Sequence, residues 1–311
     1  MTTQVAAVPR VVAVPAVTAR TAGRRGMSKS RQLVLQLACI FIAATVLFPI
    51  IWIVAMSLDP RNISRPDSLI PPGASLDAYA KVIAKPTLND IPFLRIALNS
   101  ILIAVIISVA SVTIGALAAY SFSRLQFRGR EFLMIAVLAV LMLPAVATLA
   151  PLFVSLNRIT AGTFNFRASL LGVALAVTSS QLPFAIWNIK GYLDTIPREL
   201  EEAASIDGAS RFQTFLKVIL PLAKPVLAVT AFFGFIAGWT EFYFSSVFLT
   251  GNSDLTTLAM ALNGMVGQYS ASTPWSQFAA FSVLVALPVS IVYLFLQRYI
   301  ISGLTIGSVK G

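Results

Sequence analysis

Six long apolar stretches separated by short polar segments dominate the hydropathy pattern of the chain. Each is long enough to cross a bilayer, which takes roughly 20 mostly apolar residues at about 1.5 Å per residue. The stretches are Leu33–Leu58, Ala97–Phe122, Phe132–Leu156, Ala168–Trp187, Pro225–Leu249 and Phe278–Leu296. The pattern therefore predicts an all-α integral membrane protein with six transmembrane helices.

Several prolines lie inside these stretches, among them Pro144, Pro151, Pro183 and Pro288. Proline removes a backbone donor and crowds the preceding turn of a helix. In a bilayer the freed carbonyls must find partners inside the protein. We therefore expect several of the spans to be kinked.

Composition supports a membrane protein and restricts its chemistry. Hydrophobic residues make up 57% of the 311 positions and charged residues 11%, against about 25% charged in soluble domains. Histidine is absent, and Cys39 is the single cysteine. This inventory excludes a disulfide framework, a Cys/His metal site and a Cys–His nucleophile. We expect Cys39 to be a small apolar packing residue.

The net charge of +11 reflects membrane topology rather than nucleic-acid binding, because the basic residues lie in short segments between apolar stretches. With the N-terminus in the cytoplasm, sixteen of the 23 lysines and arginines lie on the cytoplasmic side and seven on the other. This distribution places both termini in the cytoplasm.

Residues 1–32 have no periodic apolar face and are rich in Ala, Val, Thr and Arg. We expect a disordered basic cytoplasmic tail here, followed by a transmembrane domain over residues 33–311. The apolar stretch from Val11 to Val17 is too short to span a membrane, and Arg24 and Arg25 then interrupt it, which argues against a cleaved signal peptide. Met27 is an alternative start site.

The segment from Lys190 to Pro221, between the fourth and fifth spans, is predicted to form two short helices around a turn. We expect Thr195 to cap the first helix, with Pro197 in its first turn. Asp207-Gly208 ends that helix, since glycine readily adopts the left-handed conformation.

The second helix of this segment begins with a predicted capping box of Ser210 and Gln213 and is closed by Pro221. Two interpretations of the whole segment remain open from the residues alone. Its alanines and carboxylates suit close packing in a groove of another protein, and its amphipathic pattern equally suits a connector lying on the membrane.

The order of residues in this segment resembles the EAA motif of ABC importer permeases. The motif runs Glu-Ala-Ala, three residues, Gly, nine residues, Ile, one residue, Leu-Pro. The matching residues here are Glu202, Ala203, Ala204, Gly208, Leu220 and Pro221, with Val218 in place of the isoleucine. Gly191-Tyr192, Ile196-Pro197, Gln297-Arg298, Gly303-Leu304-Thr305 and Val309-Lys310-Gly311 are further similar to carbohydrate-uptake permeases. The resemblance covers Leu33 to Gly311 and extends to the smaller permease subunit of maltose/maltodextrin importers.

This resemblance implies a type I importer membrane domain that forms one half of a heterodimer in the cytoplasmic membrane. The implied partners are a second permease subunit, an ATPase dimer, an extracytoplasmic sugar-binding protein and membrane lipid, with no nucleic acid. The implied function is translocation of maltose, maltodextrin or a similar oligosaccharide. An importer of this class for a different sugar is the nearest alternative.

The resemblance also implies a coupling helix that docks in a cleft of the ATPase. Glu202 would pair with a basic residue there, and Gly208 would set the turn. The implied ATPase-coupling residues are Glu202, Ala203, Ala204, Asp207 and Gly208. The chain has no Gly-x-x-x-x-Gly-Lys-Ser/Thr phosphate loop. We therefore expect ATP and Mg on the ATPase, no cofactor on this chain, and a transport subunit rather than an enzyme.

Glu241 is the one acid that the pattern places inside a span. With Trp239 and Tyr243 it forms a candidate translocation path, because aromatic faces and hydrogen-bond acceptors suit hydroxylated rings and an intramembrane acid usually faces a cavity or partner. The alternative is a structural acid with a hydrogen-bond partner, and the implied role of the partner permease in holding the sugar slightly favours it.

Two further segments acquire candidate roles from the resemblance. The loop residues Gly251, Asn252, Ser253 and Asp254 would reach into the sugar-binding protein, although their composition is also that of an ordinary turn. The C-terminal tail, residues 297–311, would contact the ATPase through Gly303, Leu304, Thr305 and Lys310, although chain ends are commonly frayed.

Two other classes of protein fit the sequence less well. A proton- or sodium-coupled carrier usually has paired intramembrane ionisable residues and internal repeats, whereas Glu241 stands alone in the predicted spans. An intramembrane enzyme would need a nucleophile–base pair or a metal cluster, and the pattern shows neither.

The topology gives a direct prediction. Reporter domains fused after Lys29 and after Gly208 should be cytoplasmic, and a reporter fused near Asp254 should be extracytoplasmic. Alkaline phosphatase and green fluorescent protein fusions would measure this. A cytoplasmic reporter at Asp254 would contradict the six-span topology.

Overall fold

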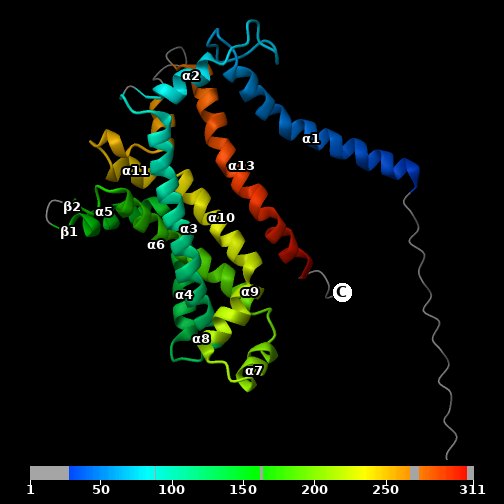
Figure 1. The fold of residues 1–311 in the computed structure, drawn as a ribbon, viewed down its shortest axis with the longest axis vertical. Coiled ribbons are helices and arrows are strands. Elements are labelled where there is room, and N and C mark those ends of the chain that lie inside the picture. Colours follow the sequence, from blue (N-terminus) through cyan, green and yellow to red (C-terminus); the bar gives the residue numbers. More distant parts are fainter. Residues whose placement is uncertain (1–27, 88, 162–163, 267–272, 307–311) are drawn as a thin grey trace, which may run out of the picture. The chain divides into compact units, whose positions relative to one another are not determined.

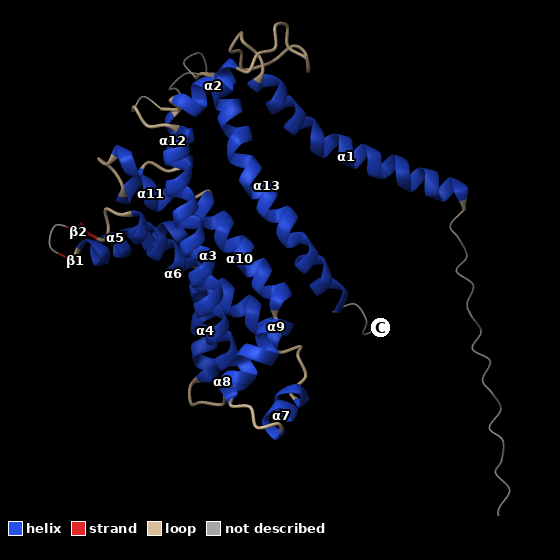
Figure 2. Cartoon of the chain, in the orientation of Figure 1, coloured by secondary structure: helices blue, strands red, loops and turns tan. Residues whose placement is uncertain are grey.

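The computed structural model describes residues 28–87, 89–161, 164–266 and 273–306 (Figures 1 and 2). The chain divides into two compact units, residues 1–49 and 50–311. The elements of the membrane domain are α1 (Lys29–Ser57), α2 (Asp77–Ala84), α3 (Phe93–Arg124), α4 (Arg130–Leu141), η1 (Ala145–Thr148), α5 (Leu149–Asn157), α6 (Leu170–Leu193), α10 (Lys224–Trp239), α11 (Tyr243–Phe248), η3 (Ser253–Leu255), α12 (Leu258–Gly264) and α13 (Trp275–Ile306). The predicted all-α class is confirmed; the strands described are the two-residue β1 (Thr160–Ala161) and β2 (Phe164–Asn165), paired antiparallel.

Five segments of the described chain are long and apolar enough to cross a membrane. They are α1, α3, α6, the pair α10–α11, and the Trp275–Tyr299 part of α13. The third predicted stretch, Phe132–Leu156, is not one straight helix: α4 and the helix that follows it are bent by 102°. Counting that bent pair as one span gives the predicted six.

Pro144 explains the break in the third stretch. It precedes η1 with an extended backbone, ψ 131°, and a proline disfavours helical geometry in the residue before it. The other prolines are accommodated within helices, with Pro151 near the start of α5 and Pro183 and Pro288 inside α6 and α13. A missing N–H costs little in a first turn, which accounts for Pro151.

Helix α1 crosses the boundary between the two units, which lies at Pro49 and Ile50. Its buried residues are Ala55, Met56 and Ser57, all at its C-terminal end. Cys39 lies in the first unit and is exposed there, and its role as an apolar packing residue stays a prediction.

Within residues 50–311, α3 packs against both α6 and α10. The contact with α10 is very close because Gly234 and Gly238 face α3. A Cβ at Gly238 would lie 2.5 Å from the Cα of Ala104, and one at Gly234 would lie 2.9 Å from the Cα of Ser108. Small residues four apart are a known means of bringing two membrane helices together. The sequence analysis missed this Gly-x-x-x-Gly pair.

Polar bonds reinforce the packing of α10. The Ser108 hydroxyl on α3 donates to the Ala231 carbonyl at 2.9 Å. On the other side, the buried indole N–H of Trp239 donates to the Val285 carbonyl of α13 at 3.0 Å. These bonds satisfy polar groups that have no access to water, and they fix α10 between α3 and α13.

The close approach of α3 and α10 predicts a strong effect of one added methyl group. Gly238→Ala should lower the stability of the detergent-purified protein, since the new Cβ would overlap backbone rather than a movable side chain, a cost of about 1–3 kcal/mol for overpacking. Gly191→Ala is the matched control: Gly191 is also helical, and a Cβ there meets nothing within 4 Å. Thermal unfolding would compare the two. Equal midpoints would contradict the tight packing.

Candidate functional site

The segment between α6 and α10 carries the candidate site, and α7 (Glu199–Ile206) is its first helix. The predicted cap at Thr195 is wrong. Helix α6 continues to Leu193, so Thr195 belongs to the turn that closes α6, and its hydroxyl donates to the Tyr192 carbonyl at 2.7 Å. Arg198 precedes α7 instead, and its carbonyl accepts the first backbone bonds of the helix.

Gly208 ends α7 as predicted, with φ +81°. Its N–H donates to the Ser205 carbonyl at 3.1 Å, and the Ala209 N–H donates to the Ala204 carbonyl at 3.0 Å. This pair of bonds is the Schellman motif, which requires a left-handed residue. A Cβ at Gly208 would meet nothing within 4 Å. The backbone conformation, and not lack of space, therefore selects glycine here.

The next helix, α8 (Arg211–Thr214), begins with the predicted capping box. The Ser210 N–H donates to Gln213 Oε1 at 2.9 Å, and the Gln213 N–H donates to Ser210 Oγ at 3.3 Å. Both orphan donors at the start of the helix are thus satisfied.

Pro221 does not close this helix, contrary to the prediction. α8 continues into a π-helical turn, η2 (Phe215–Ile219), and then into α9 (Leu220–Leu222), with a single residue before α10. The wider turn has an i→i+5 spacing. Pro221 follows this turn closely but does not force the chain out of the helix. The π turn already interrupts the regular i→i+4 backbone hydrogen bonds, so the N–H that proline lacks is not needed there.

The coupling residues inferred from the resemblance share the exposed side of α7 and its terminal turn. Glu202, Ala203, Asp207 and Gly208 are exposed and Ala204 is half-buried. No side chain of α7 is buried, and Ile206 is 87% exposed. In the part of the chain that the structure describes, one short helix thus offers a carboxylate, small residues and an apolar side chain that are exposed or half-buried.

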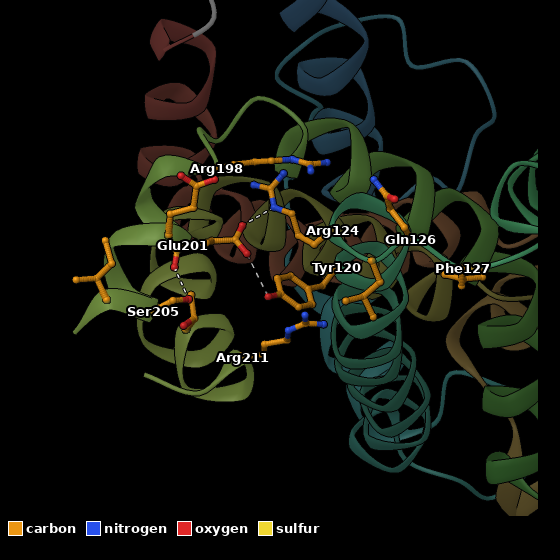
Figure 3. Close-up of a pocket in the computed structure, with 12 residues that line it drawn as sticks. Tyr120, Arg124, Gln126, Phe127, Arg198, Glu201, Ser205 and Arg211 are labelled. Carbon is orange, nitrogen blue, oxygen red and sulfur yellow. Dashed lines mark hydrogen bonds and ion pairs between the residues drawn. The ribbon is translucent and has the colours of Figure 1, made fainter. Parts of the chain in front are cut away.

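Glu201, which the sequence analysis did not single out, anchors α7 to the transmembrane helices. Its Oε1 accepts from Nε of Arg124 in an ion pair, and its Oε2 accepts from the Tyr120 hydroxyl at 3.2 Å (Figure 3). The side chains of Arg124 and Glu201 are only 7% and 17% exposed. Neighbouring helical residues point about 100° apart. Glu201 can therefore face α3 while Glu202 faces outward.

Arg124 has further partners that tie the end of α3 to this segment. Its Nη2 donates to the Ile196 carbonyl at 2.9 Å, just before α7. The adjacent Ser123 hydroxyl donates to Asp194 Oδ1 at 2.6 Å, and Lys190 lies 2.6 Å from Asp194 Oδ2. Burial raises the pKa of Asp194, but the bonds from Lys190 and Ser123 outweigh burial and hold that pKa below its usual range.

A recess of about 850 Å³ lies beside this ion pair. Tyr120, Arg124, Arg198, Glu201, Glu202 and Arg211 are among the residues that line it. Figure 3 shows Tyr120 and Arg124 of α3, Glu201 of α7 and Arg211 of α8 around this recess. Glu202, Ser205 and Ile206 of α7 also line this recess, so the recess opens beside the exposed side of that helix.

Known proteins share this arrangement of elements. Residues 111–306 match the family described as the binding-protein-dependent transport system inner membrane component. The chain is 36% identical over 285 residues to the trehalose/maltose transport system permease protein MalG of Thermococcus litoralis, which covers 90% of this chain and 98% of that protein.

The chain belongs to this family. It is also 34% identical to the trehalose transport system permease protein SugB of Mycobacterium tuberculosis, over 85% of this chain and 93% of that protein. A bacterial ABC transporter that imports alginate has the same fold, with a TM-score of 0.71 and 24% identity over 88% of this chain and 99% of that one. The chain is thus an ABC importer permease of the inner membrane, a transport subunit and not an enzyme, as the motif predicted.

The three candidate path residues of the permease do not come together. Trp239 is 1% exposed and packs inside the core. Glu241 is 8% exposed, and its Oε1 accepts the Phe244 N–H at 2.6 Å at the start of α11. Tyr243 is 60% exposed. Glu241 and Tyr243 line a recess of about 240 Å³ together with Gln181, and Trp239 is not among its lining residues.

The loop after α11 is exposed from Gly251 to Asp254, and α3 holds it by hydrogen bonds. Gly251 has φ +87°, a conformation that favours glycine. Asn99 of α3, which the sequence analysis missed, donates through Nδ2 to the carbonyls of Asp254 at 2.8 Å and Thr256 at 2.9 Å. The loop is therefore held in a defined position.

The C-terminal tail of the permease is helical for most of its length. Gly303, Leu304 and Thr305 lie in α13, which continues past the predicted span to Ile306. Lys310 lies outside the described residues.

Proposed function

We propose that this permease carries maltose, maltodextrin or a closely related α-linked glucoside inward across the cytoplasmic membrane. The support is the likeness, over about nine tenths of the chain, to permeases named for maltose, maltodextrin and trehalose. These named sugars share small, neutral, hydroxyl-rich glucose units, so one class of substrate accounts for all the names.

The importer that we propose contains this chain, a second permease subunit, an ATPase dimer and an extracytoplasmic sugar-binding protein. The family description itself refers to a binding protein. A solved alginate importer of similar fold was captured with its periplasmic protein. ATP and Mg would bind to the ATPase, since this chain lacks a phosphate loop. Both of its termini would lie in the cytoplasm.

The exposed surface of α7 is the observation that carries the coupling role. In the importer, α7 would seat in a cleft of the ATPase with Ala203 and Ala204 close to its wall and Glu202 paired with a basic residue. Gly208 would keep the following turn clear of that cleft. Closure of the ATPase dimer on ATP would then move α7 and convert the cavity from inward-facing to outward-facing.

The remaining candidate segments take subsidiary roles. Glu241 serves first as a cap for α11, and Tyr243 beside it would face the sugar path; Trp239 would act only by packing. The anchored loop of Gly251, Asn252, Ser253 and Asp254 would meet the sugar-binding protein. Gly303, Leu304, Thr305 and Lys310 would contact the ATPase.

The coupling role predicts that either of two substitutions weakens retention of the ATPase. Glu202→Ala should weaken ATPase retention, since truncating one partner of a buried interfacial ion pair costs about 2–5 kcal/mol. Gly208→Val should do the same, because a β-branched residue disfavours a positive φ. Gly208→Asn is the matched control, since asparagine tolerates that conformation. ATPase co-purification and sugar uptake would measure both. Full retention and uptake in Glu202→Ala and Gly208→Val would refute the docking of α7.

The substrate class is tested with the cognate sugar-binding protein. Calorimetric titration with maltose, maltotriose, trehalose, sucrose and an acidic oligosaccharide should show binding of the α-linked glucosides and none of the acidic sugar. Uptake of radiolabelled maltose by cells should require this permease. Exclusive binding of a sugar outside the class would remove the substrate assignment and leave the importer assignment intact.

A further inference from the structure

Helix α3 bonds directly to both segments that the proposed function assigns to partner proteins. At its C-terminal end, Arg124 and Tyr120 hold Glu201 of α7, and Arg124 also holds the Ile196 carbonyl. Glu201 is bound on both carboxylate oxygens, and the ion pair is largely shielded from water. α7 is thus fastened to α3 by side-chain bonds, in addition to its connection along the chain.

The N-terminal end of α3 is fastened to the opposite loop in the same manner. Asn99 donates both amide hydrogens, one to the Asp254 carbonyl and one to the Thr256 carbonyl. Beside it, the buried Ser100 hydroxyl accepts the Leu258 N–H at 2.9 Å. Three bonds from two adjacent residues therefore hold the exposed loop and the start of α12, more than 150 positions away in the sequence.

The helix between these two anchors is one unbroken element. α3 contains no proline, and it runs unbroken from Phe93 to Arg124. Asn99 and Arg124 are about 37 Å apart along it, at a rise of 1.5 Å per residue. Close contacts at Gly115, Gly234 and Gly238 lock it against α6 and α10, so it has little freedom to bend between its ends. In Figure 2, α3 runs from the end where α12 lies toward the end where α7 lies.

We propose that α3 is the mechanical link between the two docking segments, with Asn99 and Arg124 as its positioning residues. When a binding protein displaces the loop at Asp254, the bonds of Asn99 move α3, and the Arg124–Glu201 pair moves α7. The reverse path carries motion of the ATPase outward. Equilibrium coupling between two sites is reciprocal, so each anchor serves both directions. This inference rests on the proposed docking roles of α7 and of the loop.

The test uses the complete importer reconstituted in proteoliposomes and measures the ratio of ATPase activity with and without sugar-loaded binding protein. Glu201→Gln removes the charge that holds Arg124, and Asn99→Ala removes both bonds to the loop. Each should lower the ratio about fivefold or more, the lower bound of typical allosteric couplings. The controls are Glu199→Gln on α7 and Asn263→Ala on α12, both exposed, and they should leave the ratio unchanged.

The double variant separates a link from two independent defects. If one helix carries the coupling, breaking its second anchor should lower the ATPase ratio little further. The ratio of Asn99→Ala combined with Glu201→Gln should therefore equal the lower of the two single-variant ratios. Independent sites far apart would instead multiply their effects. Multiplied effects, or unchanged ratios in both single variants, would overturn the proposal.

Two measures keep the result interpretable. Co-purification and the thermal midpoint of each complex show whether a variant has merely lost assembly. If Glu201→Gln does not assemble, Tyr120→Phe takes its place, since it removes only the hydroxyl bond to Glu201 and should lower the ratio by a smaller factor. The stimulating sugar is first chosen from maltose, trehalose and a wider panel. A stimulating sugar outside the α-glucosides would refute the substrate class, and the link is then tested with that sugar.

Discussion

The close packing of α3 against α6 and α10 is the constraint on which the rest of the domain depends. A bilayer provides no hydrophobic force to join one apolar helix to another, so the helices must gain by close contact and by internal polar bonds. Gly234 and Gly238 allow the α10 backbone to approach α3, and Ser108 uses that proximity to bond across the pair. The position of α3 fixed in this way sets where Asn99 and Arg124 can reach.

Polar side chains of the domain form hydrogen bonds at the places where the chain leaves regular helix. Arg124 holds the approach to α7, Asn99 holds the loop before α12, and Glu241 caps the interrupted end of the fifth span. Each satisfies backbone or side-chain groups that would otherwise be buried without a partner, which costs about 1–3 kcal/mol for a group of this kind. The same residues therefore stabilise the fold and position the surfaces that we propose meet other proteins.

The sequence predicted those features that depend on local chemistry. Hydropathy located the spans, a glycine and a carboxylate located the end of α7, and the Ser210–Gln213 box located the start of α8. It misplaced the cap at Thr195 and the end at Pro221, because α6 runs on past its apolar part and a π turn follows α8. It missed Glu201 and Asn99, since their partners lie far away in the chain and no local pattern marks them. The Gly234–Gly238 pair was the one such feature that spacing alone could have revealed.

The π-helical turn before α9 has a consequence for the geometry of the coupling segment. Such a turn holds one residue more than an α turn, so the side chains before it are rotated by about 100° relative to an uninterrupted helix continuing from α10. The directions in which α8 and α10 present their faces are therefore set independently. The α8 segment can take its own direction while α10 keeps Gly234 and Gly238 turned toward α3. A single extra residue thus lets the segment proposed to meet the ATPase be oriented separately from the helix that packs within the membrane.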